Sequence, residues 1–259
     1  MKVYVVLGTL VLVAIVGFFI WSNFSSKKST TTPQLESTQQ DGQMGNKSDS
    51  SNSPAFSNPK KSAHYESNTP AHGAVLAGAP INIVIDFNFD LAKPSEMKVI
   101  NDGKDYGVGE TIIDSSKLAL RRKVSVDAQD GLYTVEYKAC WPDGSCHNGN
   151  FQFAIDRSKA ANFDDQTGEK EVIVKLSQIQ FEPKNVKVSK GTQITWINDD
   201  EVDHYINTDS HPGHTYYPPQ NSKLLKKGES FELIFNQAGI YPYHCSAHAT
   251  SMIGAVLVQ

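Results

Sequence analysis

The chain has 259 residues, a formal net charge of −4 at pH 7 and three cysteines. This length accommodates two domains of ordinary size. Nucleic-acid binding depends on a surplus of Lys and Arg that neutralises phosphates, so the acidic balance excludes a nucleic-acid partner from our expectations.

The chain begins with an almost unbroken apolar run from Tyr4 to Trp21. As a helix this run is about 27 Å long, just enough to cross the hydrocarbon core of a membrane. No small-x-small cleavage motif follows it, and we expect residues 1–24 to form an uncleaved signal anchor, with a cleaved signal peptide as the alternative. Both place the rest of the chain on the extracytoplasmic (periplasmic or extracellular) side of the cell membrane.

Residues 25–62 are rich in Ser, Thr, Gln, Asn and Lys and contain few large apolar side chains. Such a composition cannot bury enough apolar surface to fold, which predicts a disordered linker. As a flexible coil it would reach roughly 35 Å from the membrane.

Short strands are predicted over residues 63–157. Apolar residues occupy every second position from Ile81 to Leu91, from Tyr133 to Ala139 and from Phe151 to Ile155. This period of two is typical of strands with one face in a core, and Asp130-Gly131 supplies a turn. The pattern predicts an all-β sandwich.

This segment resembles the CopC copper-resistance family at His64, at 67–76 (Ser-Asn-Thr-Pro-Ala-His-Gly-Ala-Val-Leu) and at 130–137 (Asp-Gly-Leu-Tyr-Thr-Val-Glu-Tyr). The resemblance implies an immunoglobulin-like sandwich. Its histidines His64, His72 and His147 have two interpretations: an altered second copper site, or ordinary surface residues.

Two of the three cysteines, Cys140 and Cys146, flank the turn Trp141-Pro142-Asp143-Gly144-Ser145. A disulfide there suits an oxidising exterior and would stabilise the fold by roughly 2 kcal/mol. A metal site formed by Cys140, Cys146 and His147 is the alternative.

A polar break at Ser158 to Thr167 is expected to link this sandwich to a second domain over 168–259, which starts with the alternating Val172, Val174 and Leu176. Near its end, Cys245, His248 and Met252 have Cys-x2-His-x3-Met spacing. A thiolate, an imidazole and a thioether that converge make a soft site, which selects copper over magnesium, calcium or manganese.

His204, after the strand-like run Thr192 to Asn198, supplies the second imidazole. Two His and one Cys with a weak axial Met are the ligands of blue-copper electron-transfer sites. The sequence therefore predicts one type 1 copper bound by His204, Cys245, His248 and Met252.

The second domain resembles a plastocyanin-type cupredoxin. The matching pieces are 181–188 (Phe-Glu-Pro-Lys-Asn-Val-Lys-Val), 190–192 (Lys-Gly-Thr), 196–198 (Trp-Ile-Asn), His204, 239–241 (Gly-Ile-Tyr) and the loop from Cys245 to Gly254. The resemblance implies a Greek-key β-sandwich that binds copper at one end through the same four ligands.

Three other polar features of this domain need interpretation, and two of them have alternatives. The segment 211–214 (His-Pro-Gly-His) either binds a second metal or is an ordinary loop, and we favour the loop. Asp199, Asp200, Glu201 and Asp203 either dock a basic partner or form a solvated turn. His244 should point away from the copper, because side chains alternate along a strand.

We expect a membrane-tethered protein that carries single electrons to an unidentified redox partner, with no organic cofactor. Enzyme activity is not expected, because the eight histidines show no His-x-His pairs for further catalytic copper, and hydrolase motifs are missing. The alternative function is copper handling at the cell surface, with a second copper at His64, His72 or His147.

Overall fold

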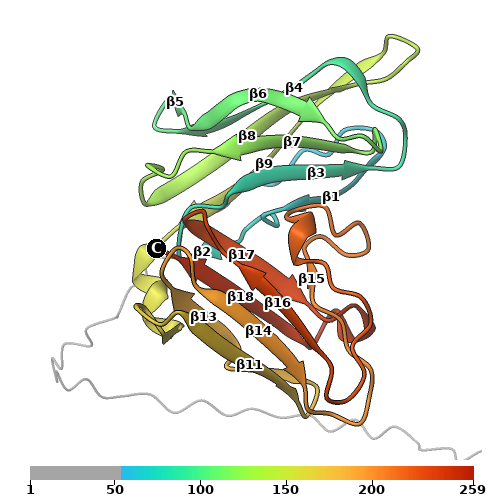
Figure 1. Cartoon of the computed structure of the whole chain (residues 1–259). Coiled ribbons are helices and arrows are strands. Elements are labelled where there is room, and N and C mark those ends of the chain that lie inside the picture. The colour runs from blue at the N-terminus through green and yellow to red at the C-terminus, as the bar shows by residue number, and fades with distance from the viewer. Residues whose placement is uncertain (1–53) are drawn as a thin grey trace, which may run out of the picture. The chain divides into compact units, whose positions relative to one another are not determined.

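The structure, a computed structural model, describes residues 54–259, which form β-strands with only short 3-10 helices (Figure 1). The all-β expectation is confirmed. The anchor predicted for residues 1–24 and most of the linker predicted for 25–62 lie outside the described residues. Within 54–259, no helix has the length and apolar character needed to cross a membrane.

The first half of the described chain is a sandwich of two sheets, with strand orders β1-β3-β7-β6 and β2-β9-β8-β4-β5. Its strands are β1 (Tyr65–Thr69), β2 (Val75–Leu76), β3 (Asn82–Phe87), β4 (Ala92–Asn101), β5 (Lys104–Asp105), β6 (Gly107–Ile113), β7 (Ala119–Val124), β8 (Gly131–Cys140) and β9 (Cys146–Ile155).

Strand β3 is buried on both faces. Ile83, Ile85 and Phe87 project into the core of the first sandwich, as their alternation predicts. Val84 projects from the opposite face, is 0% exposed and belongs to the apolar cluster of the second sandwich. The alternation predicted one buried face; the second face is buried because another sandwich packs against it.

Strands β8 and β9 form an antiparallel hairpin that is paired over the whole of β8, from Gly131 to Cys140. At its end, Cys140 lies opposite Cys146. These two cysteines form the predicted disulfide, so neither sulfur is a free thiol that could bind a metal. His147 packs its ring edge-on against Trp141 beside this turn.

The predicted disordered linker over 25–62 extends too far at its C-terminal end. Lys60 exchanges backbone hydrogen bonds with Asn150 of β9 at 3.0 and 2.9 Å. The amide of Ser57 donates to the side chain of Gln152 at 2.7 Å. These bonds hold part of the polar segment along a sheet edge, so its composition alone did not determine its structure.

The polar link from Ser158 to Thr167 is also structured. The 3-10 helix η1 (Arg157–Asn162) is capped by Asp156, whose side chain accepts from the amide of Ser158. Strand β10 (Asp164–Asp165) then pairs in parallel with β13 (Asn185–Val188) of the second sandwich. Capping and strand pairing satisfy backbone groups that a free linker would leave to water.

The second sandwich has strand orders β12-β11-β14-β16 and β10-β13-β18-β17-β15. The strands after β10 are β11 (Glu171–Ser177), β12 (Gln180–Glu182), β13 (Asn185–Val188), β14 (Gln193–Asn198), β15 (Asn207–Thr208), β16 (Ser230–Ile234), β17 (Gly239–His244) and β18 (Ile253–Val258); η2 (Pro218–Gln220) and η3 (Ser246–His248) are 3-10 helices. Val172, Val174 and Leu176 are buried in its core, as predicted.

Tyr216 joins the two sandwiches. Its ring is 0% exposed, its hydroxyl oxygen accepts from the amide of Ile81 at 2.9 Å, and its hydroxyl proton goes to the carbonyl of Ile240 at 2.7 Å. Pro80 and Ile240 form a β-bridge beside it. One buried phenol thus connects the start of β3 with β17.

Replacing Tyr216 by Phe should lower the free energy of unfolding by about 1–3 kcal/mol, because the buried amide of Ile81 would lose its acceptor. Urea denaturation measures this loss. Tyr217→Phe is the matched control, since no hydrogen bond to the Tyr217 hydroxyl is found among residues 54–259. An equal effect of both substitutions would contradict the assigned role of Tyr216.

Candidate metal centre

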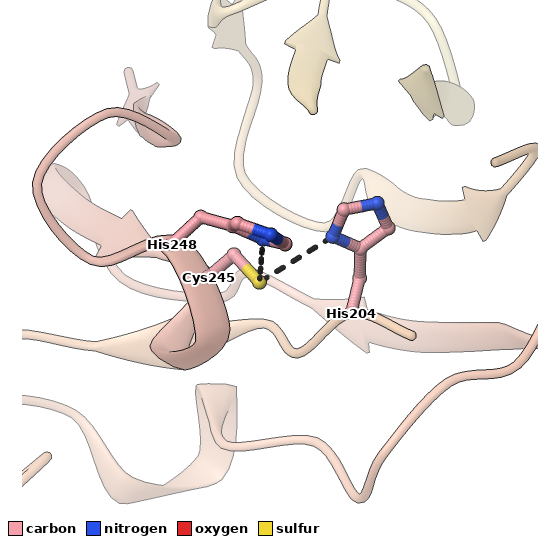
Figure 2. Close-up of side chains that lie close together, drawn as sticks. All are labelled: His204, Cys245 and His248. Atoms are coloured by element: carbon pink, nitrogen blue, oxygen red, sulfur yellow. Dashed lines mark hydrogen bonds between the residues drawn. The ribbon is translucent and has the colours of Figure 1, made fainter. Parts of the chain in front are cut away.

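Three predicted ligands meet at one end of the second sandwich. Cys245 directly follows β17, His248 lies in η3, and His204 is held by a β-bridge to Leu225. The Cys245 sulfur lies 3.5 Å from Nδ1 of His204 and 3.6 Å from Nδ1 of His248 (Figure 2). The sequence therefore identified three side chains that the fold brings together.

These separations fit ligands of one metal ion. Metal–sulfur and metal–nitrogen bonds of about 2.3 and 2.0 Å, at angles between tetrahedral and trigonal, place the two ligand atoms about 3.5 to 3.8 Å apart. Both observed distances lie in or at the edge of this range. The donor set of one thiolate and two imidazoles suits copper.

Burial differs among the three ligands. Cys245 and His204 are each 0% exposed, whereas His248 is only half-buried. The thiolate is therefore shielded from water and oxidants, and His248 is the ligand nearest to solvent.

Backbone hydrogen bonds close the loop that holds the ligands. The amide of Cys245 donates to the carbonyl of Met252 at 3.0 Å, and the amide of Met252 donates to the carbonyl of His248 at 2.9 Å. Met252 is 1% exposed on this loop. Its thioether as the fourth ligand remains a prediction.

The Cys245 sulfur also accepts a hydrogen bond from the amide of Tyr205, at 3.4 Å. A hydrogen bond to a metal-bound thiolate withdraws charge from it and so adjusts the reduction potential of the metal. Tyr205 follows His204 in the chain. This short segment therefore supplies one metal ligand, His204, and a hydrogen-bond donor to a second ligand, Cys245.

Asp200 orients His204. Its Oδ2 lies 2.8 Å from Nε2 of His204, on the ring nitrogen that faces away from the sulfur. When Nδ1 binds a metal, the proton sits on Nε2 and the carboxylate accepts it. Burial raises the pKa of Asp200, but the amides of Ile179 and Gln178 and the His204 ring outweigh it, so the pKa lies below its ordinary value.

The other acidic residues of this turn have separate surroundings. Glu201 forms an ion pair with Lys227, and Asp199 lies 3.9 Å from Lys175. Asp203 is exposed. From the sequence we interpreted the four acidic residues as one feature, but only Asp200 contacts a predicted metal ligand.

The histidines of the first sandwich do not converge. Nδ1 of His72 accepts from the amide of Gln152 at 3.1 Å, and Nδ1 of His64 lies 3.1 Å from the side-chain oxygen of Asn88. Among residues 54–259, neither of them nor His147 belongs to a group of three metal-ligating side chains.

A second histidine group was missed by sequence reasoning. His244 points away from Cys245, as predicted, but it meets His211 and His214 there. Burial, followed by smaller effects of His244 and His211, lowers the pKa of His214 below its ordinary value. The signal that could have revealed this group was His244 beside Cys245, taken together with the His-x2-His segment His211 to His214.

Removing the Asp200 carboxylate should weaken metal binding by the centre about 10–100-fold, because His204 would lose the partner that fixes its ring. Asp200→Ala is compared with Asp203→Ala, which deletes an exposed carboxylate in the same turn. Competition with a copper chelator measures the affinity. Equal affinities in the two variants would show that Asp200 does not position the ligand.

Comparison with known proteins agrees with this geometry. Residues 168–259 match the family described as copper binding proteins of the plastocyanin/azurin type, and residues 65–156 match the CopC domain. Amicyanin of Paracoccus denitrificans is 28% identical over 88 residues, which cover 34% of this chain and 65% of amicyanin. The chain thus spans slightly less than two thirds of that relative.

Two further proteins are similar. Plastocyanin of Scenedesmus fuscus is 30% identical over 105 residues, covering 34% of this chain and 100% of the plastocyanin. The solved structure of a purple cupredoxin from Nitrosopumilus maritimus is 30% identical, covers 34% of this chain and 99% of that protein, and has a TM-score of 0.30. The chain therefore belongs to the plastocyanin/azurin family of copper-binding proteins and carries a CopC domain ahead of its cupredoxin domain.

Proposed function

We propose that this protein carries single electrons through one type 1 copper bound by His204, Cys245, His248 and Met252. The observation that supports this most is the convergence of a fully buried thiol with two imidazole nitrogens at 3.5 and 3.6 Å. Copper in such a site alternates between the +1 and +2 states. Fast electron transfer through such a site needs rigidly held ligands that move little when the metal changes state.

This rigidity comes from the surroundings of the ligands. Asp200 fixes the ring of His204, the Tyr205 amide holds the sulfur, and the loop closes through the bond from Cys245 to Met252. A prearranged ligand set lowers the rearrangement that accompanies each electron transfer. No substrate or proton donor is needed, and we expect no enzyme activity.

His248 is the expected route for electrons. It is half-buried, whereas the other imidazole ligand is fully enclosed. On the same end, Met252 helps to line a hollow of about 460 Å³, together with Ile179 and Ile253, whose exposed fractions are 41% and 46%. We expect a redox protein to dock briefly at this hollow, whose lining also includes polar residues such as Lys184.

We further propose that residues 1–24 anchor the protein in the cell membrane and that the two sandwiches lie on its extracytoplasmic side. The disulfide between Cys140 and Cys146 supports an oxidising compartment. The redox partner would then be a membrane or extracytoplasmic protein. Copper handling is the alternative function, favoured by the CopC domain alone.

Copper(II) added to the full-length protein should give an intense blue absorption whose final intensity corresponds to one blue copper per chain, and this absorption should be abolished in Cys245→Ala. The double variant Cys140→Ala/Cys146→Ala, which removes the other two cysteines, should stay blue. Visible absorption and electron paramagnetic resonance record both results. A blue species that survives in Cys245→Ala would refute the ligand assignment.

Electron transfer and copper handling differ in the fate of the reduced metal. An electron carrier should be reduced and reoxidised repeatedly with one electron per blue centre, and it should keep its copper in the presence of a copper(I) chelator. Cyclic voltammetry before and after chelator treatment tests this. Rapid loss of copper on reduction would favour delivery of the metal instead.

A further inference from the structure

His211, His214 and His244 form a second group of metal-ligating side chains. His244 ends β17, and the other two lie in the loop between β15 and η2. One ring nitrogen from each lies within 4.8 Å of the others. The ring centres are 5.2 to 5.4 Å apart, so the three imidazoles enclose a small common space.

The closest pair has the spacing of two ligands of one ion. Nε2 of His244 lies 3.3 Å from Nε2 of His214. Two nitrogens bound at about 2.0–2.1 Å in tetrahedral geometry are about 3.3 Å apart. A simple hydrogen bond also fits this distance, but it leaves His211 unexplained.

An acidic neighbour orients the ring of His244 as in metal sites. Nδ1 of His244 lies 3.0 Å from Oδ1 of Asp209, which leaves Nε2 of that ring for the common space. Metal-binding histidines usually donate their second ring N–H to such a carboxylate. The hydroxyl of Ser246 lies 3.0 Å from Nε2 of His214, the nitrogen that also faces His244, so this hydroxyl would have to release that nitrogen when a metal binds.

The first sandwich holds the loop that carries two of these histidines. Asp86 of β3 accepts hydrogen bonds from Ser210 and, at 2.8 Å, from Thr215. Arg121 of β7 donates to the carbonyl of Tyr216 at 3.0 Å. His211 and His214 therefore lie on a segment fastened at both ends rather than on a free loop.

We propose that His211, His214 and His244 bind a second metal ion, separate from the thiolate centre. Three imidazoles without a sulfur suit a divalent ion, and copper(II) would bind more tightly than zinc(II). His211 is exposed and His244 is 2% exposed, so the site opens to solvent on one side and leaves a position for water. The proposal does not depend on electron transfer by the thiolate centre.

The full-length protein should bind two equivalents of copper(II), one blue and one without intense colour. His214→Ala should lose the second equivalent and its electron paramagnetic resonance signal, while the blue absorption remains and shows that the protein is folded. His72→Ala, a histidine outside the group, should keep both. Asp209→Ala should weaken the second site about 10–100-fold by releasing His244.

Other results would overturn the proposal. Saturation of the wild-type protein at one equivalent would show that the histidines bind no second copper. A second equivalent that survives in His214→Ala, or disappears in His72→Ala, would place it elsewhere. If no blue species forms but a colourless equivalent depends on His214, the electron-transfer proposal fails and the second site stands.

Discussion

The metal centre depends on the hydrogen bond from the Cys245 amide to the Met252 carbonyl. It continues the ladder of β17 and β18 by one step beyond the pair of His244 and Ile253. The ligand loop is thereby closed at its base, and η3 forms its first half. A loop closed in this way has few conformations, so the thiol and the imidazole of His248 meet without a large entropic cost.

The remaining imidazole comes from a different part of the fold and needs its own support. His204 forms a β-bridge with Leu225, and its ring contacts the carboxylate of Asp200. That carboxylate accepts hydrogen bonds from two amides of the turn between β11 and β12. The sheet with β17 and β18 thus supplies Cys245 and His248, and the sheet with β11 and β12 supports His204 through Asp200. The buried thiol of Cys245 is held in one position relative to the imidazoles because elements of both sheets support the ligands.

Much of the metal centre and of the strand pattern could be predicted from the sequence, for physical reasons. Cys245 and His248 are three residues apart, so their proximity follows from local geometry, and alternating Val172, Val174 and Leu176 mark a strand in any context. The contact between Asp200 and His204 was not accessible in this way, because it requires the amides of Gln178 and Ile179. The meeting of His244 with the His211 loop likewise depends on two segments that only the folded chain places together.

The buried second face of β3 has a consequence for how the molecule comes apart. Val84 and Ala119 of the first sandwich belong to the same apolar cluster as the core of the second, and Ala77 packs with Ile240 and Leu257. Separating the halves would expose this surface to water, at about 25 cal/mol for each Å². The two halves should therefore unfold together, in a single calorimetric transition.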